Sequence, residues 1–336
     1  MRRNAHFMRR GGALLAVLWL TAALAAIAFS VASTVRSETD RTSTHLDSTR
    51  AYFLAAGAIE RALAYMEWGA RYRNPDGTPR FFEPWMRQLR FEFDTGWAVV
   101  NIVPENAKLN LNTSPPEDLA RLLAALGVEP VRAERIVAGI VARRTGQGGP
   151  APGIFEVISP PGVPSFRPPR ASFQEVEELL LVNGVTPELF YGGLEMAAQG
   201  RPVRRLGLRD CLSVYGSRWA VDANSAPAPV LAAAGLLEQE IRVILEARTA
   251  APFRNLQRLR ELGLRPVVSP RLTLGGTQMY TLRATAWLRA AGGKPGDLRR
   301  TVGALVYFGE SGAVRNPVLR WYDWMWEHND AWISEN

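Results

Sequence analysis

The apolar run near the amino terminus is the feature that most constrains this chain. No charged residue lies between Leu14 and Val35. With the glycines before it, the apolar stretch of about 24 residues would form a helix of roughly 36 Å, which exceeds the ~30 Å hydrocarbon core of a bilayer. A secretory signal core is about 7–15 residues, so this run is too long for simple cleavage and release. The sequence therefore predicts a single-pass membrane helix over 13–35, whose cytoplasmic side carries four arginines, Arg2, Arg3, Arg9 and Arg10.

Two glycines, Gly11 and Gly12, separate the basic leader from the apolar run. A glycine pair at the start of a helix disfavours helix formation. A flexible site of small residues is, by contrast, what a protease at the membrane surface requires. A membrane anchor alone does not account for the pair, so we treat Gly11 and Gly12 as candidate cleavage-site residues.

Helical periodicity continues beyond the membrane. One apolar stripe recurs at helical spacing through Leu54, Ala55, Ala58, Ile59, Ala62, Leu63 and Met66. A single helix from Gly12 to Trp68 is expected, with a length of about 85 Å. Alternating apolar residues in 88–104, interrupted at Asp94-Thr95-Gly96, then predict a β-hairpin, and a second strand block lies at 277–309.

The segment 109–275 between the two strand blocks has a helical pattern and contains a repeat. The stretch "NLNTSPPEDLARLLAALGV" (110–128) is similar to "DANSAPAPVLAAAGL" (222–236), and each copy continues into further helices. In the first copy Ser114 is expected to cap a helix that begins at Pro115, with Ser225 capping in the second copy. A long Pro/Gly-rich surface loop is expected within the first copy.

The repeats resemble the paired helix-hairpin-helix modules of membrane-anchored competence DNA receptors. Those modules bind phosphates through backbone N–H groups of a Gly-x-Gly hairpin. The four hairpins here keep the first glycine and lack the second; they contain Gly127, Gly184, Gly235 and Gly263. Glu129 would also face the phosphate. Packing and protein contact are therefore favoured, although the net charge of +8 keeps a membrane-anchored DNA-binding protein as the alternative function.

The sequence contains no recognisable catalytic or cofactor-binding motif. The three histidines, His6, His45 and His328, have no cysteine or serine partner in a recognisable motif, and there is no phosphate-binding Gly-rich loop after a strand. The single cysteine, Cys211, excludes an intrachain disulfide. No enzyme activity is expected and no cofactor is evident. The Trp-rich tail, "RWYDWMWEHNDAW", is expected to form a last strand with a packed end rather than a partner-docking patch.

A basic leader, a glycine, an apolar helix, an amphipathic continuation and a small antiparallel sheet resemble the type IV pilin class. Within it, "RRGGALLAVLWLTAALA", "LNLNTSPPEDLARLLAALG", "ASFQEVEELLLVNGVTPELF" and "VDANSAPAPVLAA" together resemble the general secretion pathway protein K family. These are large minor pseudopilins of type II secretion. The resemblance implies cleavage by a prepilin peptidase between Gly11 and Gly12, with Gly12/Ala13 as the alternative.

The resemblance also implies a place in an assembly. Most pilins carry Glu five residues into the mature chain, whereas this chain has Ala16 there, as the K family does. That departure suits a subunit at the filament tip, where it would initiate assembly with the I- and J-type minor pseudopilins. The implied location is the bacterial inner membrane, with the bulk of the chain in the periplasm. Family members often carry an acidic stretch after the second helix of the first repeat, so the resemblance implies calcium as a possible cofactor; here that stretch reads "IVARRTGQGGP" and has no acidic residue.

The expected fold class is α+β: a long transmembrane helix, a small antiparallel pilin-like sheet and a large, inserted, all-helical domain with two helix-hairpin-helix-like repeats. The expected division is a leader at 1–11, the helix at 12–68 and the inserted domain at 109–275. The two parts of the sheet region are expected at 69–108 and 276–336, the latter including the tail.

Overall fold

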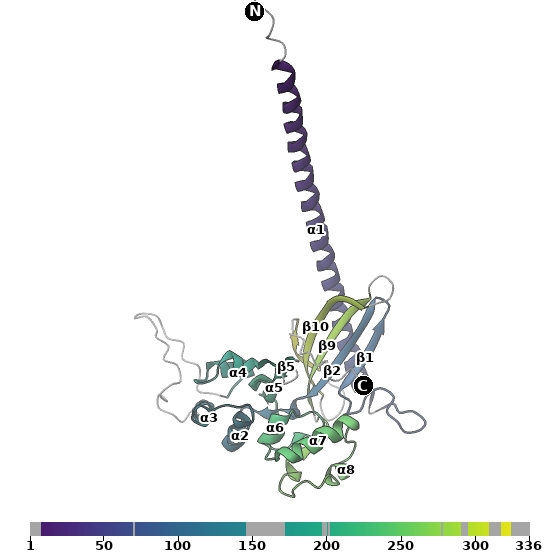
Figure 1. Ribbon diagram of the computed structural model, residues 1–336. Helices are drawn as coiled ribbons and strands as arrows, with labels where there is room; N and C mark the ends of the chain where they lie inside the picture. Colours follow the sequence, from purple (N-terminus) through teal and green to yellow (C-terminus); the bar gives the residue numbers. More distant parts are fainter. Residues whose placement is uncertain are drawn as a thin grey trace, which may run out of the picture.

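The long amino-terminal helix dominates the shape of the molecule (Figure 1). The computed structural model describes residues 8–69, 71–145, 172–196, 200, 202–276, 278–289, 295–308 and 317–323. Its first element, α1 (Met8–Gly69), is one continuous helix of 62 residues. The half that carries the apolar run projects away from the other elements, and the second half packs on a sheet (Figure 1). The predicted long helix is confirmed.

The sheet has five antiparallel strands in the order β1-β2-β9-β10-β11. The predicted hairpin is confirmed, with Phe93 opposite Gly96 at its tight end. The second predicted strand block supplies the next two strands, and the last strand begins the Trp-rich tail. The strands are β1 (Gln88–Phe93), β2 (Gly96–Pro104), β9 (Met279–Arg289), β10 (Pro295–Tyr307) and β11 (Val318–Tyr322).

One face of this sheet packs against α1. Because side chains alternate between the two faces of a strand, every second residue of β2, β9 and β10 points towards the helix. The buried members on these strands are Ala98, Val100, Ile102, Tyr280, Leu282, Ala284, Ala286, Val302, Ala304 and Val306. The predicted helix stripe meets them and is buried apart from the half-buried Leu54. The many alanines on both surfaces allow the helix backbone to lie close to the sheet.

An insert with its own core lies in the chain between β2 and β9. Its largest fully buried side chains include Phe173, Phe190 and Phe253. The α-helices are α2 (Pro116–Ala125), α3 (Pro130–Thr145), α4 (Pro187–Tyr191), α5 (Leu208–Cys211), α6 (Ala228–Ala233), α7 (Glu238–Ala250) and α8 (Leu256–Arg260). The 3-10 helices are η1 (Glu105–Ala107), η2 (Val176–Leu181) and η3 (Ser269–Arg271).

The insert is mainly but not entirely helical. It contains two parallel pairs, β3 (Leu109–Asn110) with β6 (Leu212–Ser213) and β7 (Val221–Asp222) with β8 (Leu272–Thr273). An antiparallel pair is formed by β4 (Gly193–Met196) and β5 (Pro202–Arg205). Strands of two to four residues are too short to show a periodicity of two, which explains why the sequence predicts an all-helical insert.

The predicted repeat is present in three dimensions. In the first copy the Asn112 side chain bonds both the N–H and the C=O of Phe173, at 2.7 and 2.8 Å. In the second copy Asn224 bonds Phe253 in the same way, at 2.8 and 2.9 Å. Each copy therefore closes through one asparagine, which ties the start of the repeat to the segment just before its third helix. We call this contact the asparagine clamp.

Helix capping at the start of each repeat differs from the prediction. Ser114 was expected as the cap of α2, but the helix begins at Pro116, the N-cap is Pro115, and the Ser114 hydroxyl is buried with no partner among the described residues. Pro116 forces the residue before it into an extended conformation, so Pro115 cannot start the helix. In the second copy Pro227, and not Ser225, is the N-cap. The predicted Pro/Gly-rich loop and most of the Trp-rich tail lie outside the described residues.

Candidate functional site

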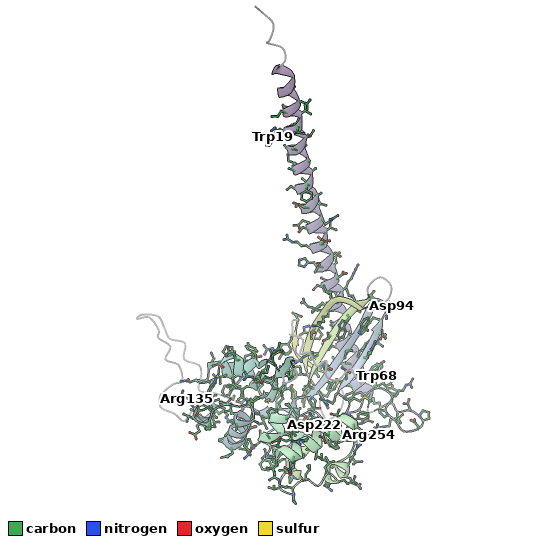
Figure 2. All side chains as sticks on the ribbon, in the orientation of Figure 1. Trp19, Trp68, Asp94, Arg135, Asp222 and Arg254 are labelled. Carbon is green, nitrogen blue, oxygen red and sulfur yellow. The ribbon has the colours of Figure 1, made fainter. Side chains whose placement is uncertain are left out.

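The projecting half of α1 is the first candidate functional region. Among the described residues it is a helix long and apolar enough to cross a membrane. Every residue from 12 to 46 is exposed, and Trp19 points outward from the bare helix (Figure 2). Leucine, valine and isoleucine side chains on all sides of a helix are stable only in lipid or against other helices. The geometry therefore fits a membrane anchor or a helix bundle.

The predicted cleavage-site residues lie near the beginning of this helix. Gly11, Gly12 and Ala16 all fall within α1, and a Cβ added at Gly12 would meet no atom within 4 Å. Nothing in the described part of the chain shields this site from an enzyme. Each glycine makes the local helix about 1 kcal/mol less stable than alanine would, so this turn opens more readily than the turns that follow. Cleavage itself remains a prediction.

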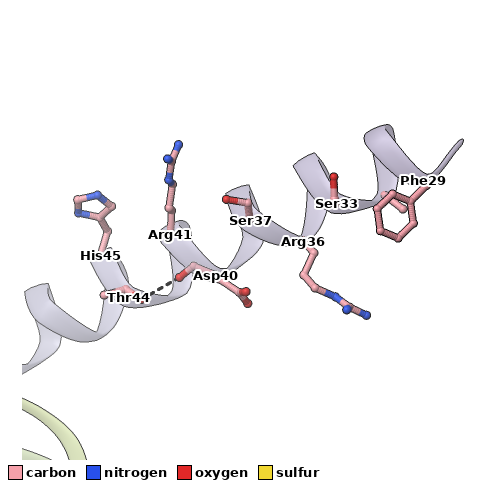
Figure 3. A pocket seen from close by; sticks show the side chains of 9 residues that line it. Phe29, Ser33, Arg36, Ser37, Asp40, Arg41, Thr44 and His45 are labelled. Carbon is pink, nitrogen blue, oxygen red and sulfur yellow. Dashed lines mark hydrogen bonds between the residues drawn. The ribbon is translucent and has the colours of Figure 1, made fainter. Parts of the chain in front are cut away.

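A hollow on α1 lies just beyond the apolar run (Figure 3). Phe29, Arg36, Asp40, Arg41 and His45 contribute to its lining. All of its residues belong to one exposed helix, as Figure 3 shows, so the hollow has no opposite wall that could orient a substrate. We assign no chemistry to it.

The hairpin glycines act as helix ends. Gly127, Gly184, Gly235 and Gly263 all have positive φ, between 70° and 94°. After α2, the Val128 N–H donates to the Leu123 carbonyl and the Gly127 N–H to the Ala124 carbonyl. The same pair of bonds follows α6. This is the Schellman arrangement, which needs glycine because other residues are strained at positive φ.

The helix amino ends that follow two hairpins are already occupied by carboxylates. Glu129 accepts hydrogen bonds from the N–H groups of Val131 and Arg132 at the start of α3, at 3.2 and 3.1 Å. Glu240 accepts from the Leu237 N–H at the start of α7, at 2.8 Å, and pairs with Arg265. A phosphate would have to displace these carboxylates. The hairpins are therefore poor phosphate sites.

No cluster of three or more metal-ligating side chains occurs within the described residues. The end of α3, where the resemblance implies an acidic stretch, carries Arg143 and Arg144. Arg143 pairs with Glu178, and Arg144 donates to the Ser114 carbonyl at 2.9 Å. These arginines engage the Ser114 carbonyl and the Glu178 carboxylate.

A polar cleft that the sequence did not reveal lies between the insert and the sheet. At its base the buried Glu105 carboxylate accepts hydrogen bonds from Thr281 of β9, at 2.6 Å, and from Ser213 of β6. Lys108 lies 3.4 Å from the same carboxylate. Glu105 thus joins the sheet to the insert. Because Glu105 and Thr281 are 176 residues apart, no local pattern marks this contact.

A long apolar helix packed on a small antiparallel sheet defines a pilin-like fold. No protein-family model matches the sequence, and no curated protein matches it. One chain in the crystal structure of the GspK–GspI–GspJ complex, from the type 2 secretion system of enterotoxigenic Escherichia coli, has a similar fold. It is 16% identical, the match covers 84% of this chain and 98% of that one, and the TM-score is 0.50. The fold is therefore that of a GspK-like minor pseudopilin.

Proposed function

We propose that this protein is a minor pseudopilin of type II secretion and a structural subunit rather than an enzyme. The observation that carries the proposal is the architecture. A helical insert with its own core lies in the chain between β2 and β9, two neighbouring strands of a pilin-like sheet. The chain in the GspK–GspI–GspJ complex supports it through the shared fold. In this role α1 crosses the bacterial inner membrane over 13–35, and the sheet and insert lie in the periplasm.

We further propose a place at the filament tip, where the subunit initiates assembly with I- and J-type partners. Ala16 supports this place because a subunit with no neighbour above it has no amine for a glutamate to pair with. An unpaired carboxylate in an apolar bundle is costly. The insert also supports a place at the tip, because it is bulky and lies at one end of the sheet (Figure 1). It would obstruct a subunit stacked on that side.

Processing by a prepilin peptidase tests this proposal. Co-expression of the full chain with the peptidase is expected to remove residues 1–11, so that amino-terminal sequencing begins at Gly12. A start at Ala13 identifies the alternative bond. A matched variant, Gly11→Leu, is expected to stay uncut, whereas Gly57→Leu on the same helix is cut normally. An intact amino terminus, or cleavage near Ala32, would contradict the pilin assignment.

A DNA-binding function is the alternative, and the occupied helix ends argue against it. We expect the purified chain to bind duplex DNA no better than a generic basic protein. A gel-shift titration at several salt concentrations measures this. Sub-micromolar affinity that falls steeply with salt, and that is lost when the hairpin glycine Gly235 is replaced by Val, would favour the DNA-binding function instead.

A further inference from the structure

The chain leaves the insert for the sheet at Gly275, and both backbone groups of this residue are held. Its N–H donates to Asp222 Oδ1 at 2.8 Å, and its C=O accepts from the Asn106 side chain at 2.9 Å. Asp222 belongs to β7 at the start of the second repeat, and Asn106 belongs to η1 at the entrance of the insert. Asp222 therefore lies where the sheet and the insert meet (Figure 2). We call these contacts of Asp222, Gly275 and Asn106 the exit latch.

The Asp222 carboxyl group is buried and only half satisfied. Asp222 is 0% exposed, and its Oδ2 atom has no hydrogen-bond partner in the part of the chain that the structure describes. Its Oδ1 atom accepts from Gly275 and, at 3.3 Å, from the Asn224 N–H. An ionised carboxylate is costly to bury unless its oxygens are bonded or paired with a cation.

The first repeat has an asparagine at the equivalent position. Asn110 lies opposite Ser213 in the β3–β6 pair, and Asp222 lies opposite Thr273 in the β7–β8 pair. Each is two residues before the asparagine of the clamp, and the Oδ1 atom of each accepts the N–H of that asparagine. Asn110 and Asp222 therefore occupy the same place in the two repeats.

The remaining polar atom at this place is a donor in the first repeat. The Asn110 Nδ2 group donates to the carbonyls one and three residues beyond its strand partner, Val214 and Gly216, at 3.1 Å each. In the second repeat the register gives these positions to Leu274 and Gly276. An ionised Oδ2 atom there would face carbonyl oxygens, whereas a protonated Oδ2 atom would donate to them.

The arginine near Asp222 does not require a charged partner. Arg248 and Arg144 occupy the same place in the two repeats, and each donates to a backbone carbonyl, at 2.7 and 2.9 Å. In the first repeat the neighbouring side chain is the neutral Asn110. A neutral acid at position 222 is therefore compatible with the buried arginine.

We propose that Asp222 is a neutral carboxylic acid in the folded chain, and that its ionisation loosens the exit latch as the pH rises. The Oδ2–H group would donate to the Leu274 carbonyl, as the amide does in the first repeat. Loss of that proton removes the donor and leaves a buried charge, which water reaches only when the exit segment opens. The proposal does not depend on the secretion role.

The groups that face Asp222 set the direction of this effect. Burial raises the pKa of Asp222 and outweighs the groups that lower it. The lowering groups are the Ser225 hydroxyl, the Gly275 and Asn224 N–H groups and the charge of Arg248. Tyr280 of β9 stays neutral, because burial and the charge of Asp222 raise its pKa to about 12. On η1, the Glu105 carboxylate is bonded to Thr281 and Ser213.

The sign of the pH dependence follows from the raised pKa. The folded chain holds the proton of Asp222 to a higher pH than the unfolded chain, in which the pKa is about 3.9. The stabilisation is therefore complete below pH ~3.9 and is lost as the pH rises through the pKa of the folded state.

Asp222→Asn, in the full chain in detergent micelles, tests the proposal because it supplies the amide that the first repeat uses. Hydrogen exchange of the peptide over 272–276 is compared with the unchanged chain at the same pH, which cancels the intrinsic exchange rate. We expect equal exchange near pH ~4, and exchange in the unchanged chain about tenfold faster or more near pH ~9. Equal exchange at every pH would overturn the proposal. Faster exchange in Asp222→Asn at neutral pH would also overturn it, because the fold would then need the charge.

The reverse substitution, Asn110→Asp, provides a matched second variant. It should give the peptide over 212–216 the pH dependence that this peptide lacks in the unchanged chain. Relative to the unchanged chain, exchange should be about equal near pH ~4 and several-fold faster near pH ~9, with a smaller effect because Asn110 is half-buried. An acceleration of the same size at both pH values would overturn the proposal.

Discussion

The asparagine clamp of the second repeat gives the sharpest test of how the insert is held together. Asn224 is 1% exposed and satisfies both the N–H and the C=O of Phe253, which is itself fully buried. Asn224→Ala removes two hydrogen bonds and leaves a buried donor and a buried acceptor without partners. Each such group costs about 1–3 kcal/mol. Some relaxation is expected, so the local loss should be about 2–4 kcal/mol.

Hydrogen exchange at the Phe253 amide measures this loss directly in the full chain. At a factor of ten for every 1.4 kcal/mol, exchange should accelerate by about thirtyfold to several hundredfold. The matched control is Asn112→Ala, which removes the same contact from Phe173 in the first repeat. Asn112 is only half-buried, so water can replace part of the contact, and the expected loss is about 1–2 kcal/mol.

Two results would refute this reasoning. An acceleration below about fivefold in Asn224→Ala would mean that the clamp contributes under about 1 kcal/mol and does not hold the repeat closed. Equal accelerations at Phe253 and Phe173 in their respective variants would mean that burial does not set the cost.

Three further predictions concern separate parts of the chain. Ala16→Glu should impair secretion of a reporter through a cost of about 2.5–3.5 kcal/mol, while Ala16→Leu is tolerated; normal secretion by the Glu variant would contradict the tip position. The hydrogen bond from Arg265 lowers the pKa of Glu240 to about 2, below its unfolded value of about 4.3. The ion pair therefore stabilises the fold above pH ~4.3, and this stabilisation is lost as the pH falls towards ~2. The difference in Tm between the unchanged chain and Glu240→Gln should shrink over that range. A difference that stays constant would refute the assignment. Gly127→Ala, at positive φ, should cost about 1 kcal/mol. Gly57→Ala should not destabilise, because Gly57 lies within the α1 helix and a Cβ added there meets no atom within 4 Å; equal Tm changes in the two would exclude the capping role.

Regular elements were predictable from the sequence because their signals are local. The stripe from Ala55 to Met66 gives the buried face of α1, and alternation gives β2 and β9. The hairpin glycines mark the ends of helices because positive φ is a property of one residue. The similarity of two stretches around Asn112 and Asn224 indicates the repeat for the same reason.

Contacts between distant parts of the chain were not predictable. The clamp residues Asn112 and Phe173 are 61 positions apart, and Glu105 meets Thr281 across the insert. Such pairs depend on the packing of whole elements, which leaves no trace in a short window. The prediction that Ser114 caps α2 was wrong for a local reason. Two successive prolines shift the start of the helix, and this outweighs the preference for serine at the N-cap.

The placement of the insert between neighbouring strands constrains the order in which the chain can fold. Pro104 and Tyr280 pair directly, so the central ladder must close a loop whose span is close to the 176 residues between Glu105 and Thr281. If the insert condenses first, its two ends emerge side by side and the open loop shrinks to a few residues. The entropic free-energy cost of closing the loop then falls by about 3 kcal/mol. The hairpin of β1 and β2 would therefore pair with β9 only after the insert has formed. Mutations in the core of the insert should slow completion of the sheet that it interrupts.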